Sequence, residues 1–241
     1  MKGVVLAGGM GSRLDPLTRV TNKHLLPIYN KPIIYYPLLT MKEAGVTEVM
    51  IVSGPEHVES FSELLGSGEE FGMKFEYKMQ EKPGGIAQAL GLTREFIGED
   101  KFIVILGDNV IEDNLSKAVT SFEGSKNGSA KIFLKKVSNP SAYGVAEVSR
   151  EKVESLVEKP EKPKSNLAII GCYMYDAGVF DMIAGLKPSD RGELEITDVN
   201  NYYLREEKLD FDVLEGFWGD CGESFDGMLE VSELVKNSRL K

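Results

Sequence analysis

Leu6-Ala7-Gly8-Gly9-Met10-Gly11-Ser12-Arg13 is a glycine-rich segment that directly follows the apolar run Gly3-Val4-Val5. The pattern predicts a buried strand that leads into a turn, because glycine permits positive φ and leaves backbone N–H groups accessible to a ligand. Arg13 adds a permanently charged guanidinium directly after the turn. We therefore predict a cradle for a polyphosphate, formed by Leu6, Gly8, Gly9, Gly11, Ser12 and Arg13.

Two other phosphate-binding patterns fit this segment poorly. The dinucleotide-binding fingerprint requires a small residue where Leu14 stands, and Pro16 blocks the helix that should follow. The Gly-Lys-Ser/Thr ending of the phosphate loop is also missing. A glycine turn that only reverses the direction of the chain is the remaining alternative.

The composition narrows the class of protein. A chain of 241 residues is long enough for one α/β domain with a full core. Its net charge of −10 argues against a nucleic-acid partner. The two cysteines, Cys172 and Cys221, lack the spacing of a metal site and indicate a reducing compartment. No apolar stretch has the length of a signal peptide core or a membrane span, so we expect a cytoplasmic protein without a membrane partner.

Apolar runs alternate with helical patterns along the first half of the chain. Strands are expected at 3–6, 49–52, 75–78 and 102–106, and helices at 33–39, 58–65 and 86–96. Pro32 suits the first turn of the first helix, and Pro37 is expected to bend it. Nearly continuous apolar strands indicate a parallel sheet covered on both faces. Because ligands of such sheets bind beyond the carboxyl ends of the strands, Arg13, Gln80 and Asp108 are expected at one edge.

The second half of the chain has a different pattern, typical of hairpins. Strands are expected at 130–134, 143–148, 153–159, 169–175 and 209–214, and helices at 179–186, 197–205 and 224–236. We expect the strands at 143–148, 153–159 and 169–175 to form an antiparallel extension on the substrate side. The predicted fold class is α/β, a Rossmann-like three-layer sandwich with a mostly parallel central sheet and a small antiparallel extension.

Eight segments of the chain resemble, in the same order, segments of the sugar-1-phosphate nucleotidyltransferases, and most closely of the glucose-1-phosphate thymidylyltransferases. Each segment is weak evidence alone, but together they extend over almost the whole chain. The matching segments are 6–13, 22–27, Gln80 with 83–89, 106–109, 143–145, 158–160, 191–198 and 218–222.

The resemblance implies an activity and a fold. A sugar 1-phosphate would attack the α-phosphorus of a nucleoside triphosphate and release pyrophosphate. The implied substrates are glucose 1-phosphate and dTTP or UTP. The implied fold is the nucleotide-diphospho-sugar transferase fold as one domain, residues 1–241, with a nucleotide-binding part at about 1–128, a sugar-binding part at about 129–223 and a C-terminal helix at about 224–236.

The resemblance also assigns roles to charged residues. Arg13 would hold the leaving pyrophosphate, and Lys23 would neutralise charge on the triphosphate as a catalytic residue. Lys159 would bind the sugar phosphate, and Glu158 would accept hydrogen bonds from sugar hydroxyls. Solvated surface residues are the alternative for each, above all for the Glu158 and Lys159 pair at the end of a strand.

Asp108 and Asp220 resemble the two Mg²⁺ ligands of the family. Magnesium keeps most of its water and takes one or two carboxylates together with phosphate oxygens, so two aspartates suffice. Asp108 follows a strongly apolar strand, where we expect a carboxylate that faces solvent. A turn residue between glycines is the alternative for Asp220.

The remaining implied residues bind the base and the sugar. A glutamine amide donates and accepts at once, so Gln80 would read a pyrimidine together with the backbone near Pro83 and Gly85. Thymine and uracil differ by one methyl group, and the sequence leaves dTTP and UTP open. The predicted sugar-phosphate residues are Asn109, Tyr143, Gly144, Glu158, Lys159, Gly171, Tyr173 and Arg191. The alternative for Tyr173 is a position in the core, and the alternative for Arg191 is a cap of the following helix. We interpret His24 and His57 as structural residues.

The chain departs from the family pattern at three points. The family has a longer side chain where Gly219 stands and a small hydroxyl residue where Cys221 stands. Thymidylyltransferases of this type usually continue beyond the last helix, with helices that form a regulatory nucleotide site and subunit contacts. We therefore expect no feedback inhibition at a second site, and a homo-oligomer stays open.

Two alternatives to the leading activity remain. The chain would act on another sugar 1-phosphate or another base, or it would be a regulatory domain that binds nucleotide sugars without catalysis. The second alternative is disfavoured because five charged residues are all retained, Arg13, Lys23, Asp108, Lys159 and Asp220.

Overall fold

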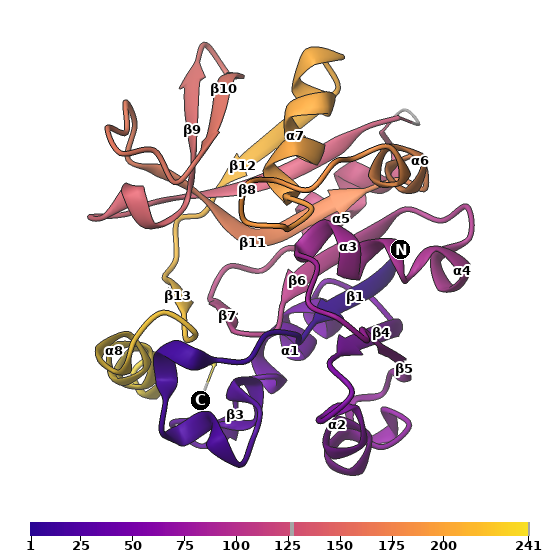
Figure 1. Cartoon of the computed structure of the whole chain (residues 1–241), viewed down its shortest axis with the longest axis vertical. Coiled ribbons are helices and arrows are strands. Elements are labelled where there is room, and N and C mark those ends of the chain that lie inside the picture. The colour runs from indigo at the N-terminus through magenta and orange to yellow at the C-terminus, as the bar shows by residue number, and fades with distance from the viewer. Residues whose placement is uncertain (126–127, 241) are drawn as a thin grey trace. The chain divides into compact units, whose positions relative to one another are not determined.

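The computed structural model describes residues 1–125 and 128–240. Its contacts divide the chain into two compact units (Figure 1). Unit N contains Lys2–Pro83, Ile105–Lys117 and Gly216–Lys241. Unit M contains Met1, Gly84–Val104 and Ala118–Glu215. Strand β6 (Phe102–Leu106) begins in unit M and ends in unit N.

A parallel sheet forms the centre of unit N. Its strands are β1 (Lys2–Leu6), β4 (Glu48–Ser53) and β5 (Lys74–Met79), with β4 in the middle. Helix α1 (Tyr35–Glu43) packs against β1, and α2 (Val58–Leu65) packs against β5. Val4, Val5 and Ile51 are fully buried, as expected for strands without a polar face. The backbone N–H of Gly107 donates to the carbonyl of Leu6 at 2.9 Å, so the end of β6 lies beside β1.

Short elements follow the first strand of unit N. They are the 3₁₀ helices η1 (Ser12–Leu14), η2 (Leu17–Arg19) and η3 (Lys23–Leu25), the hairpin of β2 (Pro27–Ile28) and β3 (Lys31–Pro32), and η4 (Glu69–Phe71). Strand β7 (Asn109–Ile111) pairs antiparallel with β13 (Trp218–Asp220).

The last helix, α8 (Phe225–Lys236), belongs to unit N although it lies far from the first strand in the sequence. The side chain of Ser224 caps it by accepting a hydrogen bond from the Gly227 N–H at 3.0 Å. Val231 and Val235 of α8 pack with Leu14, Ile28 and other residues in one buried cluster. This cluster fixes β13, and with it Asp220, beside the segment that follows the glycine turn.

Unit M contains a mostly antiparallel sheet. Its strands are β8 (Ala130–Lys136), β9 (Gly144–Ser149), β10 (Lys152–Glu158), β11 (Leu167–Tyr175) and β12 (Leu209–Val213). β9 and β10 form a hairpin (Figure 1), β11 pairs antiparallel with β9 and β8, and β12 pairs parallel with β8. Its helices are α3 (Ile86–Gly91), α4 (Arg94–Ile97), most of α5 (Ser116–Glu123), α6 (Val179–Ala184) and α7 (Ile196–Arg205), with the 3₁₀ helix η5 (Pro140–Ala142). Helix α7 packs against β8, β10 and β12.

The predicted fold class is confirmed, and two details of it are wrong. Helix α1 begins at Tyr35, so Pro32 lies in β3, and Pro37 falls in the first helical turn, where it removes no hydrogen bond. The single helix expected at 86–96 is two short helices. Thr93 lies between them and donates its hydroxyl to the carbonyl of Leu90 at 2.8 Å.

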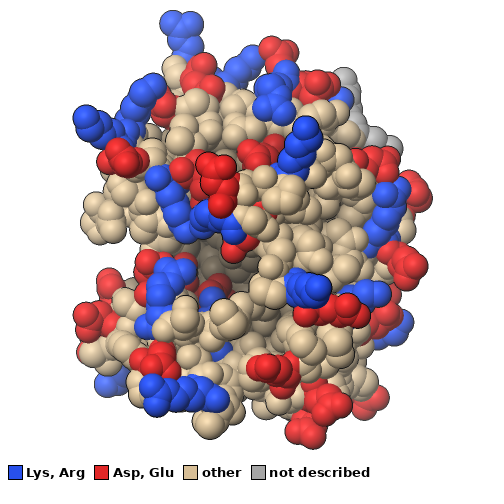
Figure 2. Space-filling view, viewed as in Figure 1, with Lys and Arg blue, Asp and Glu red and all other residues tan. Residues whose placement is uncertain are grey.

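Charge is mixed on the surface. On the face shown in Figure 2, lysine and arginine side chains lie among aspartate and glutamate side chains. None of the helices in residues 1–125 and 128–240 combines the length and the apolar character that crossing a membrane requires.

Candidate functional site

The glycine turn follows β1 and lies close to the residue that follows β5. Gly9 and Gly11 have φ of 93° and 61°, as their residue type permits. Gly8 lies outside the left-handed region, so positive φ is not the reason for glycine there. A Cβ at Gly8 would lie 2.8 Å from Oε1 of Gln80, which directly follows β5. The turn after β1 and Gln80 after β5 therefore lie together at the carboxyl edge, as the sequence predicted.

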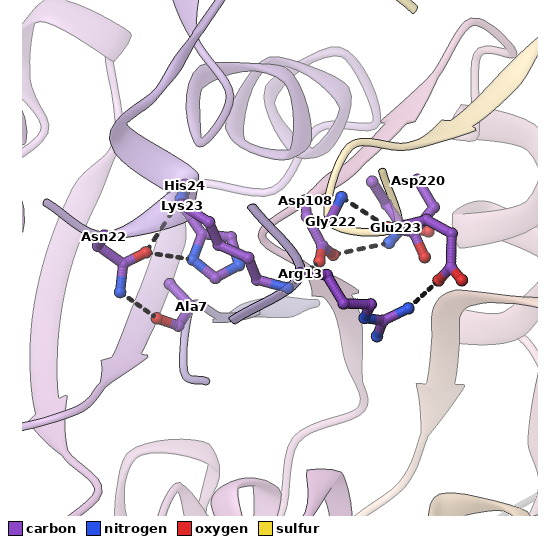
Figure 3. A network of polar contacts seen from close by, with 10 residues as sticks. Ala7, Arg13, Asn22, Lys23, His24, Asp108, Asp220, Gly222 and Glu223 are labelled. Carbon is purple, nitrogen blue, oxygen red and sulfur yellow. Dashed lines mark hydrogen bonds and ion pairs between the residues drawn. The ribbon is translucent and has the colours of Figure 1, made fainter. Parts of the chain in front are cut away.

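A buried network positions Lys23 beside this turn (Figure 3). Asn22 caps η3, and its Oδ1 accepts hydrogen bonds from the backbone N–H of His24 at 3.0 Å and from Nδ1 of His24 at 2.5 Å. Asn22 Nδ2 donates to the carbonyl of Ala7 at 3.5 Å. Burial and the charge of Lys23 lower the pKa of His24 to about 3, so its imidazole is neutral. The structural role expected for His24 agrees with this geometry.

Lys23 forms a short ion pair with Asp108, from Nζ to Oδ2. Asp108 is only 7% exposed, so the expectation of a carboxylate that faces solvent is wrong. Asn109 Nδ2 donates to the other carboxylate oxygen at 3.1 Å. Burial alone would raise the pKa of Asp108, but the charge of Lys23 and the hydrogen bonds from Lys23 and Asn109 lower it well below its usual range.

Asp220 is the second carboxylate of this cluster. It ends β13, opposite Asn109, and its Oδ1 accepts a hydrogen bond from the Gly222 N–H at 2.8 Å. Burial and the neighbouring charge of Asp108 raise the pKa of Asp220 to about 7. Two carboxylates that repel each other in a buried position favour a bound cation or a shared proton.

Gly222 has no side chain to fill the space between Lys23, Asp108 and Asp220. A Cβ at this position would lie 2.6 Å from Nζ of Lys23 and 3.3 Å from Oδ1 of Asp220, and it would also contact Oδ2 of Asp108. The bare face of Gly222 is therefore part of the site. Any larger residue would displace the Lys23 and Asp108 pair.

The donor set of this cluster fits magnesium. Asp108 and Asp220 supply hard carboxylate oxygens, and Mg²⁺ typically takes one or two of these with water and substrate phosphates. Within the described part of the chain, no group of three or more His, Cys, Asp or Glu residues is arranged to hold a metal ion by itself. The pair therefore fits an ion that a phosphate ligand completes better than an ion held by the protein alone.

Arg13 lies in η1 on the exposed side of the cluster. Its Nη1 forms a short ion pair with Oε2 of Glu223, the residue after Gly222 (Figure 3). The side chains of Arg13 and Glu223 are 58% and 37% exposed. Arg13 thus lies beside Lys23, Asp108 and Asp220 in unit N, with its guanidinium occupied by a carboxylate.

A second polar cluster lies in unit M, at the end of β10. Oε2 of Glu158 accepts a hydrogen bond from the hydroxyl of Thr197, in the first turn of α7, at 2.5 Å. A Cβ at Gly144 would lie 3.2 Å from the same carboxylate oxygen. The glycine of β9 therefore leaves room at the face of Glu158. Thr197 is 5% exposed, so it supports Glu158 from the buried side.

Arg191 is bound mainly to Glu195, which precedes α7. Its Nη2 lies 2.8 Å from Oε2 of Glu195 and 4.0 Å from Oε1 of Glu158. Burial alone would raise the pKa of Glu195, but hydrogen bonds from Arg191 and Ser189 lower it. The alternative role of Arg191, holding the start of a helix, agrees with these contacts, and a contact with the sugar phosphate stays a prediction.

Lys159 directly follows Glu158 with an exposed side chain. Its φ of 42° is in the left-handed region, which is uncommon for a residue with a side chain and occurs often at functional sites. The backbone N–H of Lys159 donates to the carbonyl of Tyr143 at 3.1 Å. These contacts bring Tyr143, Gly144, Glu158 and Lys159 together.

Comparison with known proteins identifies the family of the chain. Residues 2–238 match the family described as Nucleotidyl transferase. The chain belongs to this family. It is 43% identical over 237 residues to the low-salt glycan biosynthesis nucleotidyltransferase Agl11 of Haloferax volcanii, with 98% of this chain and 66% of that protein covered. It is 42% identical over 245 residues to the glucose-1-phosphate thymidylyltransferase of Mycolicibacterium smegmatis, with 100% and 84% covered.

Solved structures of nucleotidyl transferases have the same fold. A protein of Bacillus anthracis, assigned as a glucose-1-phosphate thymidylyltransferase and crystallised with sucrose, has a TM-score of 0.95 and 45% identity, with 100% of this chain and 97% of that chain covered. A UDP-glucose pyrophosphorylase in complex with UDP-glucose has a TM-score of 0.85 and 26% identity, with 98% of each chain covered. The resemblance to sugar nucleotidyltransferases is confirmed.

For several predicted site residues of this nucleotidyl transferase, packing alone explains the residue type. Gly85 has φ of 93°, and a Cβ there would lie 2.6 Å from the carbonyl oxygen of Leu194. Tyr173 is 4% exposed and stacks on Tyr175 at 6.1 Å between ring centroids, and Gly171 is buried in the same strand. The core alternative for Tyr173 agrees with this position. The roles of Pro83 and Gly85 at the base and of Gly171 and Tyr173 at the sugar stay predictions.

Asn109 lies in unit N, with Lys23 and Asp108. It is 1% exposed, donates to Asp108, and accepts a hydrogen bond from Nε1 of Trp218 at 2.7 Å. Its geometry fits a residue that positions Asp108 better than one that contacts a sugar phosphate. The sugar-phosphate assignment of Asn109 stays a prediction without support from its contacts.

Sequence reasoning gave no individual role to four residues of these clusters, Thr197, Gly222, Glu223 and Asn22. Thr197 and Gly222 lie in segments that resemble the family. Their contacts with Glu158 and Asp220 became visible only in the structure. Glu223 lies just outside the segment 218–222, and no motif marked it. Asn22 was part of a matching segment, yet its cap of η3 depends on a turn that the sequence pattern did not predict.

Proposed function

We propose that this chain transfers a nucleotidyl group from dTTP or UTP to glucose 1-phosphate, with Mg²⁺, to form dTDP-glucose or UDP-glucose and pyrophosphate. The observation that carries the proposal is the cluster of Arg13, Lys23, Asp108 and Asp220 beside the glycine turn of unit N. The family supports the reaction class, and the names of the relatives support the sugar.

The reaction brings two anions together and releases a third. An oxygen of the sugar phosphate forms a bond to the α-phosphorus, the bond from the α-phosphorus to the bridging oxygen breaks, and pyrophosphate leaves with the electron pair. Cations that lie ready at the site reduce the repulsion between the phosphates without reorganisation. Arg13 and the amides of the glycine turn bind the leaving pyrophosphate.

Lys23 acts on the charge that develops in the reaction. Burial alone would lower the pKa of Lys23, but the charge of Asp108 and its hydrogen bond raise it, so the ammonium stays protonated. Asn22 and His24 fix the backbone of η3, and Asp108 holds the ammonium in place. A cation positioned in this way stabilises the transition state more than a mobile surface lysine.

Asp108 and Asp220 would hold the magnesium ion, which supplies positive charge to the phosphate oxygens when bound. Asn109 and Gly222 orient the two carboxylates through their own hydrogen bonds.

The cluster of unit M takes the sugar phosphate in this proposal. Glu158 accepts hydrogen bonds from sugar hydroxyls, with Thr197 holding one of its oxygens. Lys159 and Arg191 supply positive charge for the phosphate, and Gly144 leaves space for the sugar. Gln80 and the backbone at Gly85 read a pyrimidine base. We place the enzyme in the cytoplasm, and a homo-oligomer stays a prediction.

A matrix of triphosphates against sugar 1-phosphates tests the proposal. Release of pyrophosphate is measured with Mg²⁺ for dTTP, UTP, ATP, CTP and GTP, each paired with glucose, galactose and mannose 1-phosphate. We expect the highest kcat/KM for dTTP or UTP with glucose 1-phosphate. A purine triphosphate or another sugar as the best substrate would replace the proposed pair. No release with any pair, combined with binding of nucleotide sugars, would indicate a regulatory domain.

A further inference from the structure

The guanidinium of Arg13 is not free in this structure. It is paired with Glu223, which follows Gly222 and precedes Ser224, the cap of α8. The backbone N–H of Gly222 donates to Asp220, and Glu223 is the next residue in the chain. Glu223 is therefore attached directly to the segment that holds the second carboxylate of the site. A third acidic side chain thus lies beside the predicted pyrophosphate residue, and the proposed reaction has no step for it.

We infer that Glu223 is a positioning residue that competes with pyrophosphate and with the triphosphate for Arg13, and so weakens the binding of both. The inference rests on the proposed function, since Arg13 binds pyrophosphate only there. It assigns to Glu223 a role in the release of the product.

The exposure of the pair decides how easily it opens. Exposed ion pairs contribute little net stability, because water solvates both charges well. A phosphate carries more charge than a carboxylate and matches the planar guanidinium with two parallel hydrogen bonds. Pyrophosphate therefore displaces Glu223, but its affinity is reduced by the interaction that has to break.

The displaced carboxylate also lowers the affinity for pyrophosphate in a second way. Glu223 remains attached to the segment of Asp220 after the pair opens, so its negative charge stays near the bound phosphates and repels them. Both effects lower the affinity for pyrophosphate. A product that binds less tightly leaves faster, and turnover is then less limited by release.

A structural role is the competing explanation. Glu223 lies just before the N-terminus of α8, where a negative charge interacts favourably with the helix dipole. If this were its only role, replacing Glu223 would lower the melting temperature and leave the affinity for pyrophosphate unchanged.

Glu223→Gln separates the two roles. Inorganic pyrophosphate is titrated into the full chain at low salt without divalent ions, and binding is followed by the fluorescence of Trp218, the single tryptophan, two residues before Asp220. We expect Glu223→Gln to bind pyrophosphate about two- to fivefold more tightly than the unmodified chain, which corresponds to the range of exposed ion pairs. In the transfer reaction, inhibition by pyrophosphate should strengthen by the same factor, with an unchanged KM for the sugar 1-phosphate.

Glu43→Gln is the matched control. Glu43 is 39% exposed and pairs with Arg239 at 2.7 Å, also in unit N, so the same substitution removes the same charge from the same kind of pair. We expect its affinity for pyrophosphate to equal that of the unmodified chain. Equal tightening in both variants, or no change in Glu223→Gln, would overturn the inference while the proposed function stands. An unmodified chain that neither binds nor releases pyrophosphate would overturn both.

Discussion

Lys23 is a half-buried cation whose position is set by a carboxylate 85 residues away, Asp108. Because its charge faces the phosphates of the proposed reaction, Lys23→Ala should lower kcat by about 100- to 1000-fold, with a smaller change in KM. Steady-state kinetics with both substrates varied measure the two effects separately. Lys42→Ala, on the exposed side of α1, should leave both parameters unchanged. A raised KM with unchanged kcat for Lys23→Ala would contradict a role in the transition state.

Asp108→Asn should lower stability as well as activity. The substitution removes the charge that balances Lys23 in a buried position, and loss of one partner of a buried pair costs about 3 to 5 kcal/mol where nothing else compensates. Asp220 also lies near Lys23, so we expect about 2 kcal/mol, with turnover nearly abolished. Urea unfolding measures the change. Lys23→Met combined with Asp108→Asn should regain part of the stability and none of the activity.

His24 makes stability depend on pH. The unfolded chain binds a proton at His24 near pH 6.5, whereas burial and Lys23 lower the pKa in the folded chain to about 3. The stabilisation is complete above pH 6.5 and is lost as pH falls toward 3, by up to about 1.4 kcal/mol per pH unit. Urea unfolding between pH 7 and pH 5 should show a shallower dependence for His24→Gln than for the control His57→Gln, which replaces the only other histidine. Equal slopes in both variants would show that His24 does not titrate in this way.

At the scale of elements, the start of α3 depends on a close contact with the loop before α7. The carbonyl of Gly84 accepts a hydrogen bond from the Leu194 N–H at 2.8 Å, and the Ala87 N–H donates to the Leu194 carbonyl at 3.2 Å. Gly85→Ala would add a methyl group 2.6 Å from that carbonyl oxygen. We therefore expect a loss of more than about 3 kcal/mol, measured by urea unfolding.

Gly98→Ala is the control for Gly85→Ala in the same unit. Gly98 ends α4 with φ of 63° and ψ of −123°, and a Cβ there meets no atom within 4 Å. Its cost should be about 1 to 3 kcal/mol, from backbone strain alone. Similar costs for the two variants would show that the contact with Leu194 relaxes easily.

Elements were predicted well where one local signal decides them. The apolar run 102–106 predicted β6 and the helical periodicity of 58–65 predicted α2, both with the correct bounds. A strand buried on both faces is apolar throughout, and a helix buried on one side repeats its apolar residues every three to four positions, so both can be recognised in the sequence. The break between α3 and α4 was missed because Thr93 is compatible with a helix and its hydrogen bond to Leu90 is a property of the fold. The burial of Asp108 was missed for a similar reason, since its partner Lys23 is distant in sequence.

At the scale of the whole molecule, the proposed residues for pyrophosphate and for the sugar phosphate form separate sets. The residues proposed for pyrophosphate and the metal belong to unit N, and the sugar-phosphate residues Gly144, Glu158, Lys159 and Arg191 belong to unit M. Each set is assembled from separate segments of the chain, so a ligand should protect several segments at once. Hydrogen exchange followed by mass spectrometry reads this pattern directly.

Pyrophosphate with Mg²⁺ should slow amide exchange in segments 6–14, 22–26, 106–109 and 220–223, because these amides line the cluster of unit N. Glucose 1-phosphate should instead slow exchange in 143–146, 157–160 and 191–198. Pyrophosphate is the better probe than a triphosphate, because the proposed contact of the base with Gly85 would place part of a nucleotide on unit M. Galactose without a phosphate is the control and should protect neither set. Protection of both sets by pyrophosphate alone would show that the division of roles between the units is wrong, even if the transfer reaction itself is observed.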